Sequence, residues 1–215
     1  MTTPPISPRE RIRELAAERL ARQLDFVIEI DRLKTVLRRT DISDGSRLEN
    51  SAEHSWHISV MALLLAEYAG ESLDITRVLE MLLVHDIVEV DAGDTFCYDA
   101  AANHDREERE QRAAERLFGL LPSDQAERFR ARWDEFEARA TPEARFAAAL
   151  DRLEPVLLNY VTAGGSWRRH AVDEAQVRIR NRPIGDGAAE LWDIASRLIA
   201  DAADRGWLGS GERER

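Results

Sequence analysis

The chain has 215 residues, of which 44% are hydrophobic, so its length and composition suit one domain with a sizeable buried core. Its formal net charge is -11, and arginine supplies nearly all of its 30 basic residues. An acidic surface disfavours non-specific binding to nucleic acid or to an anionic membrane, because both are held mainly by clustered positive charge. A small phosphorylated ligand stays compatible with this composition if a few arginines converge locally.

Cysteine content and terminal composition set expectations for location and domain limits. Cys97 is the only cysteine, so no internal disulfide can form, and we expect a cytoplasmic protein. The first residues contain no apolar stretch of signal-peptide length, and the longest apolar run, near residues 60–65, is too short to span a bilayer. We expect a disordered segment over 1–8, one folded domain over 9–207 and a disordered tail over 208–215.

Helical periodicity dominates the chain, and no stretch shows the alternation and β-branched enrichment of a strand. The predicted fold is therefore all-α, a single helical bundle. Residues 8–39 are expected to form one long or broken helix, and residues 41–46 a loop. The other expected helices cover residues 51–69, 74–88, 104–121, 123–136, 142–164, 173–180 and 187–203.

Two of these helices begin with capping signals. Asn50 is a suitable N-cap, and Glu53 stands three residues on, in the reciprocal position of a capping box. Thr141 followed by Pro142 is a second start signal, because proline suits the first position of a helix. Each of these two helices also carries a titratable residue in apolar surroundings.

The pair His85-Asp86 lies near the end of an expected helix, within the apolar run of residues 79–88. Burial of such groups must be compensated by a polar partner or by a metal ion. One interpretation is a core histidine that a neighbouring carboxylate satisfies. The other is a pair of metal ligands.

His54 and Asp151 extend the second interpretation. His54 begins an apolar helix and offers another nitrogen ligand of the kind that suits zinc or a transition metal. Asp151 stands in an apolar stretch where an unpaired carboxylate is costly to bury, and its alternative is a salt bridge to Arg145 or Arg152. His57 is expected to pack beside the site rather than to bind metal.

Two imidazoles and two carboxylates from buried helices make a mixed nitrogen and oxygen ligand set. Such a set suits one divalent ion of manganese, cobalt, iron, nickel or zinc, with positions left open for water. The ion would lower the pKa of a bound water molecule and stabilise negative charge on phosphoryl oxygens. The pattern therefore indicates hydrolysis of a phosphorylated compound.

Acidic residues that follow the His-Asp pair are candidates for proton transfer and substrate binding. Glu89 stands one helical turn after the pair, so it would lie near the ion without being a ligand, in the position of a general acid or base. The alternative is a solvated glutamate at a helix end. Asp94, just after Gly93, could bind a sugar hydroxyl or orient water, and Asp91 is the competing candidate for that role.

These residues stand in three ordered segments that resemble the HD-domain superfamily of metal-dependent phosphohydrolases, most closely the branch of the bacterial 5'-deoxynucleotidases and the human HD-domain-containing protein of that type. Residues 47–54 are similar to the branch's Arg-x-Glu-x-x-x-Glu/Asp-His segment. Residues 85–94 match its His-Asp-x-x-Glu-x-x-x-Gly-Asp segment, and residues 150–154 supply the distal aspartate.

The resemblance implies a single HD-domain helical bundle that forms a homodimer and acts, with one divalent ion, on nucleoside 5'-monophosphates. It makes Glu89 the catalytic acid or base, and Asp94 a catalytic residue that contacts the substrate. The metal ligands that it implies are His54, His85, Asp86 and Asp151.

The family also places a phosphate-binding arginine at the end of the helix before the first motif. Arg38 is the preferred candidate, with Arg39 and Arg47 as supporting positive charges; the alternative is an exposed pair at a helix end. The deoxynucleotidases have an aromatic residue in this region that packs on the substrate sugar, whereas residues 40–43 here contain none. Phe96 and Tyr98 could replace it or could simply pack the domain.

Other functions remain open on the sequence. The same centre could act on a nucleoside triphosphate, a guanosine polyphosphate alarmone or a cyclic nucleotide, although these need extra basic groups or longer insertions. A non-catalytic, metal-stabilised sensor or scaffold is the alternative from another class. Glu89 and Asp94 argue against it, because a purely structural site does not need them.

Overall fold

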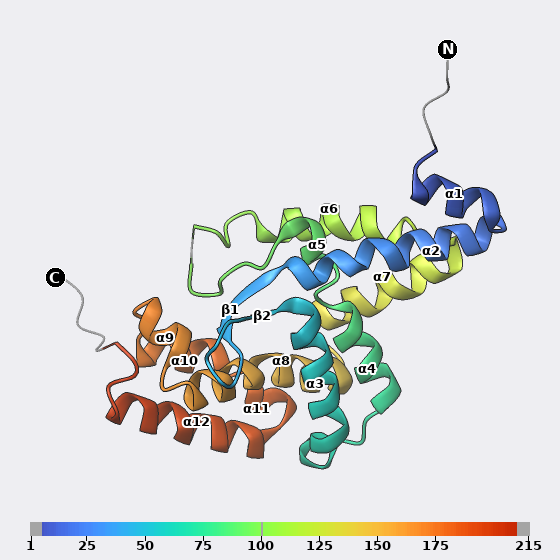
Figure 1. Ribbon diagram of the computed structural model, residues 1–215. Coiled ribbons are helices and arrows are strands. Elements are labelled where there is room, and N and C mark those ends of the chain that lie inside the picture. Colours follow the sequence, from blue (N-terminus) through green and yellow to red (C-terminus); the bar gives the residue numbers. More distant parts are fainter. Residues whose placement is uncertain (1–5, 100, 210–215) are drawn as a thin grey trace.

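The computed structural model describes residues 6–99 and 101–209, and the all-α prediction is confirmed (Figure 1). The strands within the described residues form one small sheet. Two short 3-10 helices, η1 (Asp31–Thr35) and η2 (Ala66–Tyr68), accompany the strands β1 (Leu37–Asp41) and β2 (Leu48–Asn50). The α-helices are α1 (Pro8–Leu15), α2 (Glu18–Ile30), α3 (Ser51–Leu65), α4 (Ile75–Val84), α5 (Glu89–Ala92), α6 (Arg106–Phe118), α7 (Ser123–Ala138), α8 (Pro142–Val161), α9 (Gly165–Arg169), α10 (Glu174–Asn181), α11 (Ile184–Gly187) and α12 (Ala189–Asp204).

Order at both ends extends past the expected domain limits. Ser7 caps α1, accepting a hydrogen bond from the Glu10 backbone while its own N–H donates to the Glu10 carboxylate. Leu208 is buried, and the N–H of Gly209 donates to the Val172 carbonyl at 2.8 Å. The remaining parts of the two expected disordered segments, residues 1–5 and 210–215, lie outside the described residues.

Of the long or broken helix expected over residues 8–39, the broken form is confirmed as far as residue 30, and the helical prediction for residues 37–39 is wrong. The backbone is extended at Ala16 and Ala17, which separates α1 from α2. The helix then tightens into η1 and gives way to extended backbone at Val36. Helical periodicity continued through these residues in the sequence. At the break, α1 folds back on α2, where Arg9 pairs with Glu29 and Arg13 with Asp25. The strand that follows is set by pairing with β2.

The strand that replaces the end of this helix pairs antiparallel with β2, with Leu37 opposite Asn50 and Asp41 opposite Leu48. Two strands alone are marginally stable in water, so this ribbon depends on its packing against the helices. Both α8 and α9 contact β1. Because its sequence is mostly polar, β1 shows no alternation that would predict a strand. It nevertheless carries the Arg38 side chain, which is only 12% exposed.

Helix α8 is the central element, and α3, α4, α7, α11 and α12 pack around it (Figure 1). Its apolar side chains Phe146, Leu150 and Leu153 are buried in the main core. Helix α11 lies very close to α8, because a Cβ on Gly187 would come within 2.4 Å of the Arg145 carbonyl oxygen. Only glycine permits this approach without a backbone shift.

A second apolar core lies among α2, α6, α7 and the segment that follows α4. Leu82 belongs to the main core, whereas Val84 and Ile87 belong to the second. The His85-Asp86 pair therefore stands where the two cores meet. Within the described residues, no helix is both long and apolar enough to cross a bilayer.

Candidate metal centre

Three helices bring a cluster of possible metal ligands together. His54 lies in the first turn of α3, whose Asn50–Glu53 capping box forms as expected, His85 is the C-cap of α4, and Asp151 lies within α8. One donor atom from each of these three residues lies within 4.8 Å of the others. His54 Nε2 is 3.1 Å from Asp151 Oδ1, and His85 Nε2 is 3.9 Å from the same oxygen.

The ring of His85 fits a metal ligand better than a satisfied core histidine. Its Nδ1 lies 2.8 Å from the Leu82 carbonyl oxygen, which can only accept a hydrogen bond. In a neutral ring the proton is therefore on Nδ1, and Nε2 carries a lone pair. That buried Nε2 has no hydrogen-bond partner among the described residues, and it faces Asp86 Oδ1 at 3.0 Å. A lone pair facing a carboxylate is stabilised by a cation placed between them.

Asp86 lies beside this cluster. Its Oδ1 faces His85, and its Oδ2 accepts a hydrogen bond from Arg38 Nη1 at 3.2 Å. Asp151 forms no salt bridge to Arg145 or Arg152, the alternative to metal binding that the sequence left open. Arg145 pairs with Glu71, and Arg152 donates to backbone carbonyls, so the Asp151 carboxylate keeps its place beside the two imidazoles.

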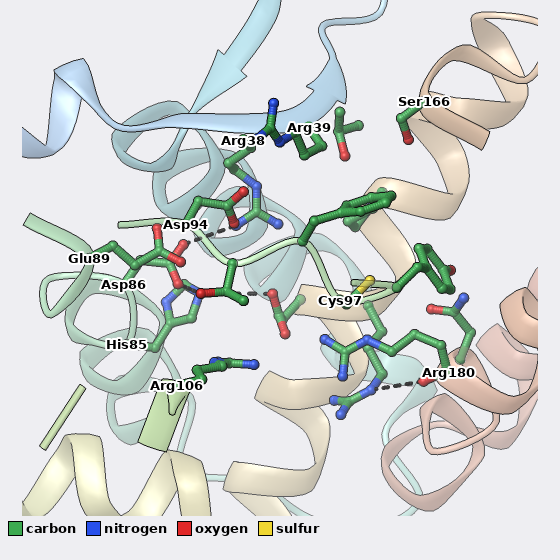
Figure 2. A pocket seen from close by; sticks show the side chains of 18 of the residues that line it. Arg38, Arg39, His85, Asp86, Glu89, Asp94, Cys97, Arg106, Ser166 and Arg180 are labelled. Carbon is green, nitrogen blue, oxygen red and sulfur yellow. Dashed lines mark hydrogen bonds and ion pairs between the residues drawn. The ribbon is translucent and has the colours of Figure 1, made fainter. Parts of the chain in front are cut away.

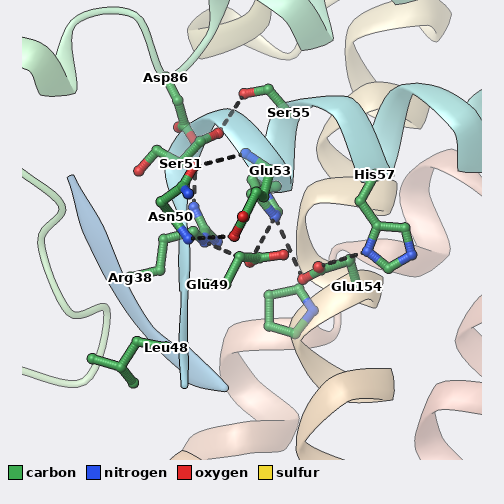
Figure 3. Close-up of polar contacts among 12 residues, drawn as sticks. Arg38, Leu48, Glu49, Asn50, Ser51, Glu53, Ser55, His57, Asp86 and Glu154 are labelled. Atoms are coloured by element: carbon green, nitrogen blue, oxygen red, sulfur yellow. Dashed lines mark hydrogen bonds and ion pairs between the residues drawn. The ribbon is translucent and has the colours of Figure 1, made fainter. Parts of the chain in front are cut away.

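A layer of glutamates behind His54 was missed in the sequence. His54 Nδ1 lies 3.4 Å from Glu154 Oε2 and 3.6 Å from Glu49 Oε2, and His57 Nδ1 lies 3.0 Å from Glu154 Oε1 (Figure 3). Burial raises the pKa of Glu49 to about 7, with Glu154 adding to the effect. Burial and Arg38 oppose protonation of His54, yet the carboxylates of Glu154 and Asp151 outweigh them and raise its pKa. Carboxylates therefore lie against both nitrogens of the His54 ring.

One sequence signal could have revealed part of this layer. Glu154 follows Asp151 by three residues on α8, so the two side chains lie one helical turn apart. Glu49, His54 and Glu154 form a second group with metal-ligand spacing. None of these three lines the pocket that His85, Asp86 and Asp151 line. The group that reaches the pocket is the one suited to chemistry on a substrate.

The sequence predicted Arg38 at the end of a helix. In the structure it reaches this pocket from strand β1. Its guanidinium bridges Asp86 and Glu49, with Nε 3.3 Å from Glu49 Oε2. Burial opposes its charge, but Asp86 and the other nearby carboxylates prevail and raise its pKa. Arg39 also lines the pocket. Arg47 does not: it forms a bidentate ion pair with Glu53 on the surface, so its expected supporting role is not borne out by its position.

The acidic residues expected to act on the substrate line the same pocket (Figure 2). Glu89 is buried and accepts a hydrogen bond from Ser51 Oγ at 2.6 Å, and burial, with Asp86 nearby, raises its pKa well above the usual value. It is therefore not a solvated residue at a helix end. Asp94 follows Gly93, whose positive φ of 73° turns the chain into the pocket, and burial raises the pKa of Asp94 as well.

The competing candidate Asp91 points elsewhere. It forms an ion pair with Arg116 of α6 and lies outside the pocket lining. The aromatic residues Phe96 and Tyr98 both line the pocket, with ring centroids 5.3 Å apart. They are thus placed to contact a substrate as well as to pack against the main core.

Known proteins match the chain in both sequence and structure. A family model described as HD domain matches residues 30–192. The chain is 30% identical over 135 residues to the 5'-deoxynucleotidase HDDC2 of Bos taurus, and this covers 62% of the chain but 64%, less than two thirds, of the cattle protein. It is 28% identical over 192 residues to the 5'-deoxynucleotidase hdd1 of Schizosaccharomyces pombe, covering 86% of each.

A solved structure agrees with this assignment. The crystal structure of a predicted metal-dependent phosphohydrolase from Magnetospirillum magnetotacticum has 56% sequence identity and a TM-score of 0.85, covering 89% of this chain and 96% of that one. The residues matched by the family model include the three helices that carry His54, His85 and Asp151. The resemblance found in the sequence is therefore confirmed, and the chain belongs to the HD domain family.

Proposed function

We propose that this protein is a metal-dependent phosphohydrolase that releases phosphate from nucleoside 5'-monophosphates, including deoxynucleotides. The observation that carries the proposal is the unpaired Nε2 of His85, which faces Asp86 and Asp151 in a pocket that Arg38 also lines. Such a site combines room for a cation with a guanidinium for a phosphate. The relatives named as 5'-deoxynucleotidases support the choice of substrate.

In this proposal one divalent ion, of manganese, cobalt, iron, nickel or zinc, is held by His54, His85, Asp86 and Asp151. When bound, the ion supplies Lewis-acid chemistry that activates water and stabilises charge on the phosphoryl group. Glu49 and Glu154 contact the outer nitrogen of His54 and keep its ring oriented.

The other residues act on the substrate directly. Arg38, with Arg39 beside it, binds the phosphate, because a guanidinium offers paired donors that match phosphoryl oxygens. Glu89 moves a proton between the attacking water and its own carboxylate, which Ser51 holds in place. Asp94 accepts a hydrogen bond from a sugar hydroxyl or from the water. Phe96 and Tyr98 provide the apolar contact that residues 40–43 lack.

The function is tested by phosphate release from ribo- and deoxyribonucleoside 5'-mono-, di- and triphosphates. The purified protein is stripped of metal and then supplied with manganese, cobalt or zinc. We expect release from the 5'-monophosphates alone, and only after metal is added. Release from triphosphates or cyclic nucleotides instead would support the same metal centre with a different substrate. No release from any compound would favour a non-catalytic sensor or scaffold.

A cytoplasmic location and a homodimer stay predictions, and the second has structural support. The second half of helix α3, over residues 58–65, carries apolar side chains on both faces, and a helical segment that is apolar all round is normally covered on every side. One face packs into the main core. The other face carries an exposed stripe, formed by Trp56, Val60, Leu63 and Leu64.

We expect light scattering to give twice the mass of one chain, and the variant Leu63→Glu to give the mass of a single chain. A buried charge at an apolar interface costs several kcal/mol, enough to separate the subunits. Val27→Glu is the matched control, since Val27 is also exposed but lies on α2, away from the stripe. A wild-type protein that is monomeric would refute this interface.

A further inference from the structure

The pocket contains a second group of arginines that the proposed mechanism does not use. Arg38 lies with His85, Asp86 and Glu89 on one side of the pocket, whereas Arg180 lies across from them (Figure 2). We define the distal arginines as Arg139, Arg152 and Arg180, which come from the end of α7, from α8 and from α10. All three line the pocket.

Arg152 is the most buried of the distal arginines, with 4% of its surface exposed. Its Nε donates to the Arg180 carbonyl at 3.2 Å, and its Nη1 donates to the Ala148 carbonyl at 3.0 Å. No carboxylate of the described chain lies within ion-pair distance of it. A buried guanidinium held only by neutral carbonyls leaves most of its charge uncompensated.

The other two distal arginines share this lack of a carboxylate partner within residues 6–99 and 101–209. Arg139 Nε is buried without a hydrogen-bond partner. Arg180 makes no ion pair, although it lies close enough to Cys97 to lower the pKa of that thiol against the larger effect of burial. Arg106, in contrast, lines the same pocket but is paired with Glu110 at 2.6 Å. Arg39 also lines the pocket without an ion pair to the described residues, but it is exposed to solvent, whereas the distal arginines are buried or half-buried.

The distal arginines also lie near one another. Arg152 donates a hydrogen bond to the Arg180 carbonyl at 3.2 Å, and all three side chains line the same pocket. Glu137 and Asp151 line the same pocket, but neither forms an ion pair with a distal arginine in the described part of the chain. On a chain with a formal net charge of -11, three such arginines in one pocket are not explained by surface composition. An anion between them would relieve both the desolvation and the repulsion, whereas a neutral nucleobase would leave the charges unbalanced.

We propose that the distal arginines form a second anion subsite, which binds a phosphate carried by the substrate at a position other than the one that is hydrolysed. The substrate class is then a nucleoside bisphosphate, such as a 3',5'-bisphosphate, with its 5'-phosphate at the metal centre. The identity of the reacting phosphate rests on the proposed function. The distal subsite itself rests only on the arginines and the pocket that they line.

Binding is measured by calorimetry on the metal-stripped protein, so that no turnover occurs. Deoxyadenosine 3',5'-bisphosphate should bind at least about tenfold more tightly than deoxyadenosine 5'-monophosphate, as expected for charge-assisted hydrogen bonds to one more phosphate. The variants Arg180→Gln and Arg139→Gln should each reduce this ratio several-fold. Arg180 and Arg139 are less buried than Arg152, so their replacement is less disruptive to folding.

Arg178→Gln is the matched control, because Arg178 lies on the same helix but pairs with Glu174 and does not line the pocket. It should leave the ratio unchanged. Equal binding of the two nucleotides by the wild type would overturn the proposal, as would a ratio that survives both pocket variants. Binding of inorganic phosphate that depends on Arg180, without a preference for the bisphosphate, would likewise show a site for a free anion and overturn a substrate subsite.

Failure of the proposed function gives a different result. One outcome is that metal-loaded protein releases no phosphate from any nucleotide while the Arg180-dependent preference for the bisphosphate persists. That result would refute the proposed nucleotidase activity and support the distal subsite. If 5'-monophosphates were hydrolysed and the preference were absent, the reverse would hold.

Discussion

The variant Asp151→Asn should lose metal and activity together. Its carboxylate lies beside both imidazoles of the cluster, 3.1 Å from His54 and 3.9 Å from His85, and asparagine keeps the shape while removing the charge. A bound metal supplies several kcal/mol of transition-state stabilisation, and about 1.4 kcal/mol corresponds to a factor of ten in rate. We therefore expect kcat/KM to fall by roughly a thousandfold or more. Elemental analysis should show metal content falling from about one ion per chain toward background.

Two comparisons make this result specific. Asp91→Asn removes a carboxylate that pairs with Arg116 outside the pocket, and it should keep both metal and activity. Added metal should raise the melting temperature of the wild type but not that of Asp151→Asn, because a ligand stabilises the folded state only if it binds there. Full metal content in Asp151→Asn would remove this residue from the ligand set.

The variant Glu89→Gln should separate metal binding from turnover. Glu89 lies in the pocket beside the cluster and is oriented by Ser51, but it is not part of the group with metal-ligand spacing. General acid or base catalysis contributes about a hundredfold or more, so kcat should fall by at least this factor. Metal content and the melting temperature should stay close to those of the wild type.

Glu110→Gln provides a matched control, because both glutamates line the pocket and both are 7% exposed. Glu110 pairs with Arg106 and has no part in the proposed reaction, so its replacement should change kcat by less than about threefold. Ser51→Ala should fall between the two variants, since it removes the hydrogen bond that positions Glu89 and leaves the carboxylate in place. Equal kcat in Glu89→Gln and the wild type would exclude the proton-transfer role.

The sequence by itself determined most of the longer helices and named most residues of the candidate site. Capping boxes and helical periodicity are local signals, so the starts of α3 and α8 could be predicted at Asn50 and Thr141. The order of the three family segments named His54, His85 and Asp151, which the fold brings together. Titratable groups in apolar runs were informative because burial requires a partner for each of them.

Only the tertiary structure decided which side chains share the pocket. Whether residues 37–41 become a strand depends on pairing with β2 and on contacts with α8 and α9, and this moved Arg38 from a helix end to a buried bridge between Asp86 and Glu49. It also separated Asp94 from Asp91, and Arg39 from Arg47. The distal arginines come from α7, α8 and α10, and no local pattern distinguishes them from surface residues. Their lack of carboxylate partners is a property of packing, which composition and periodicity do not encode.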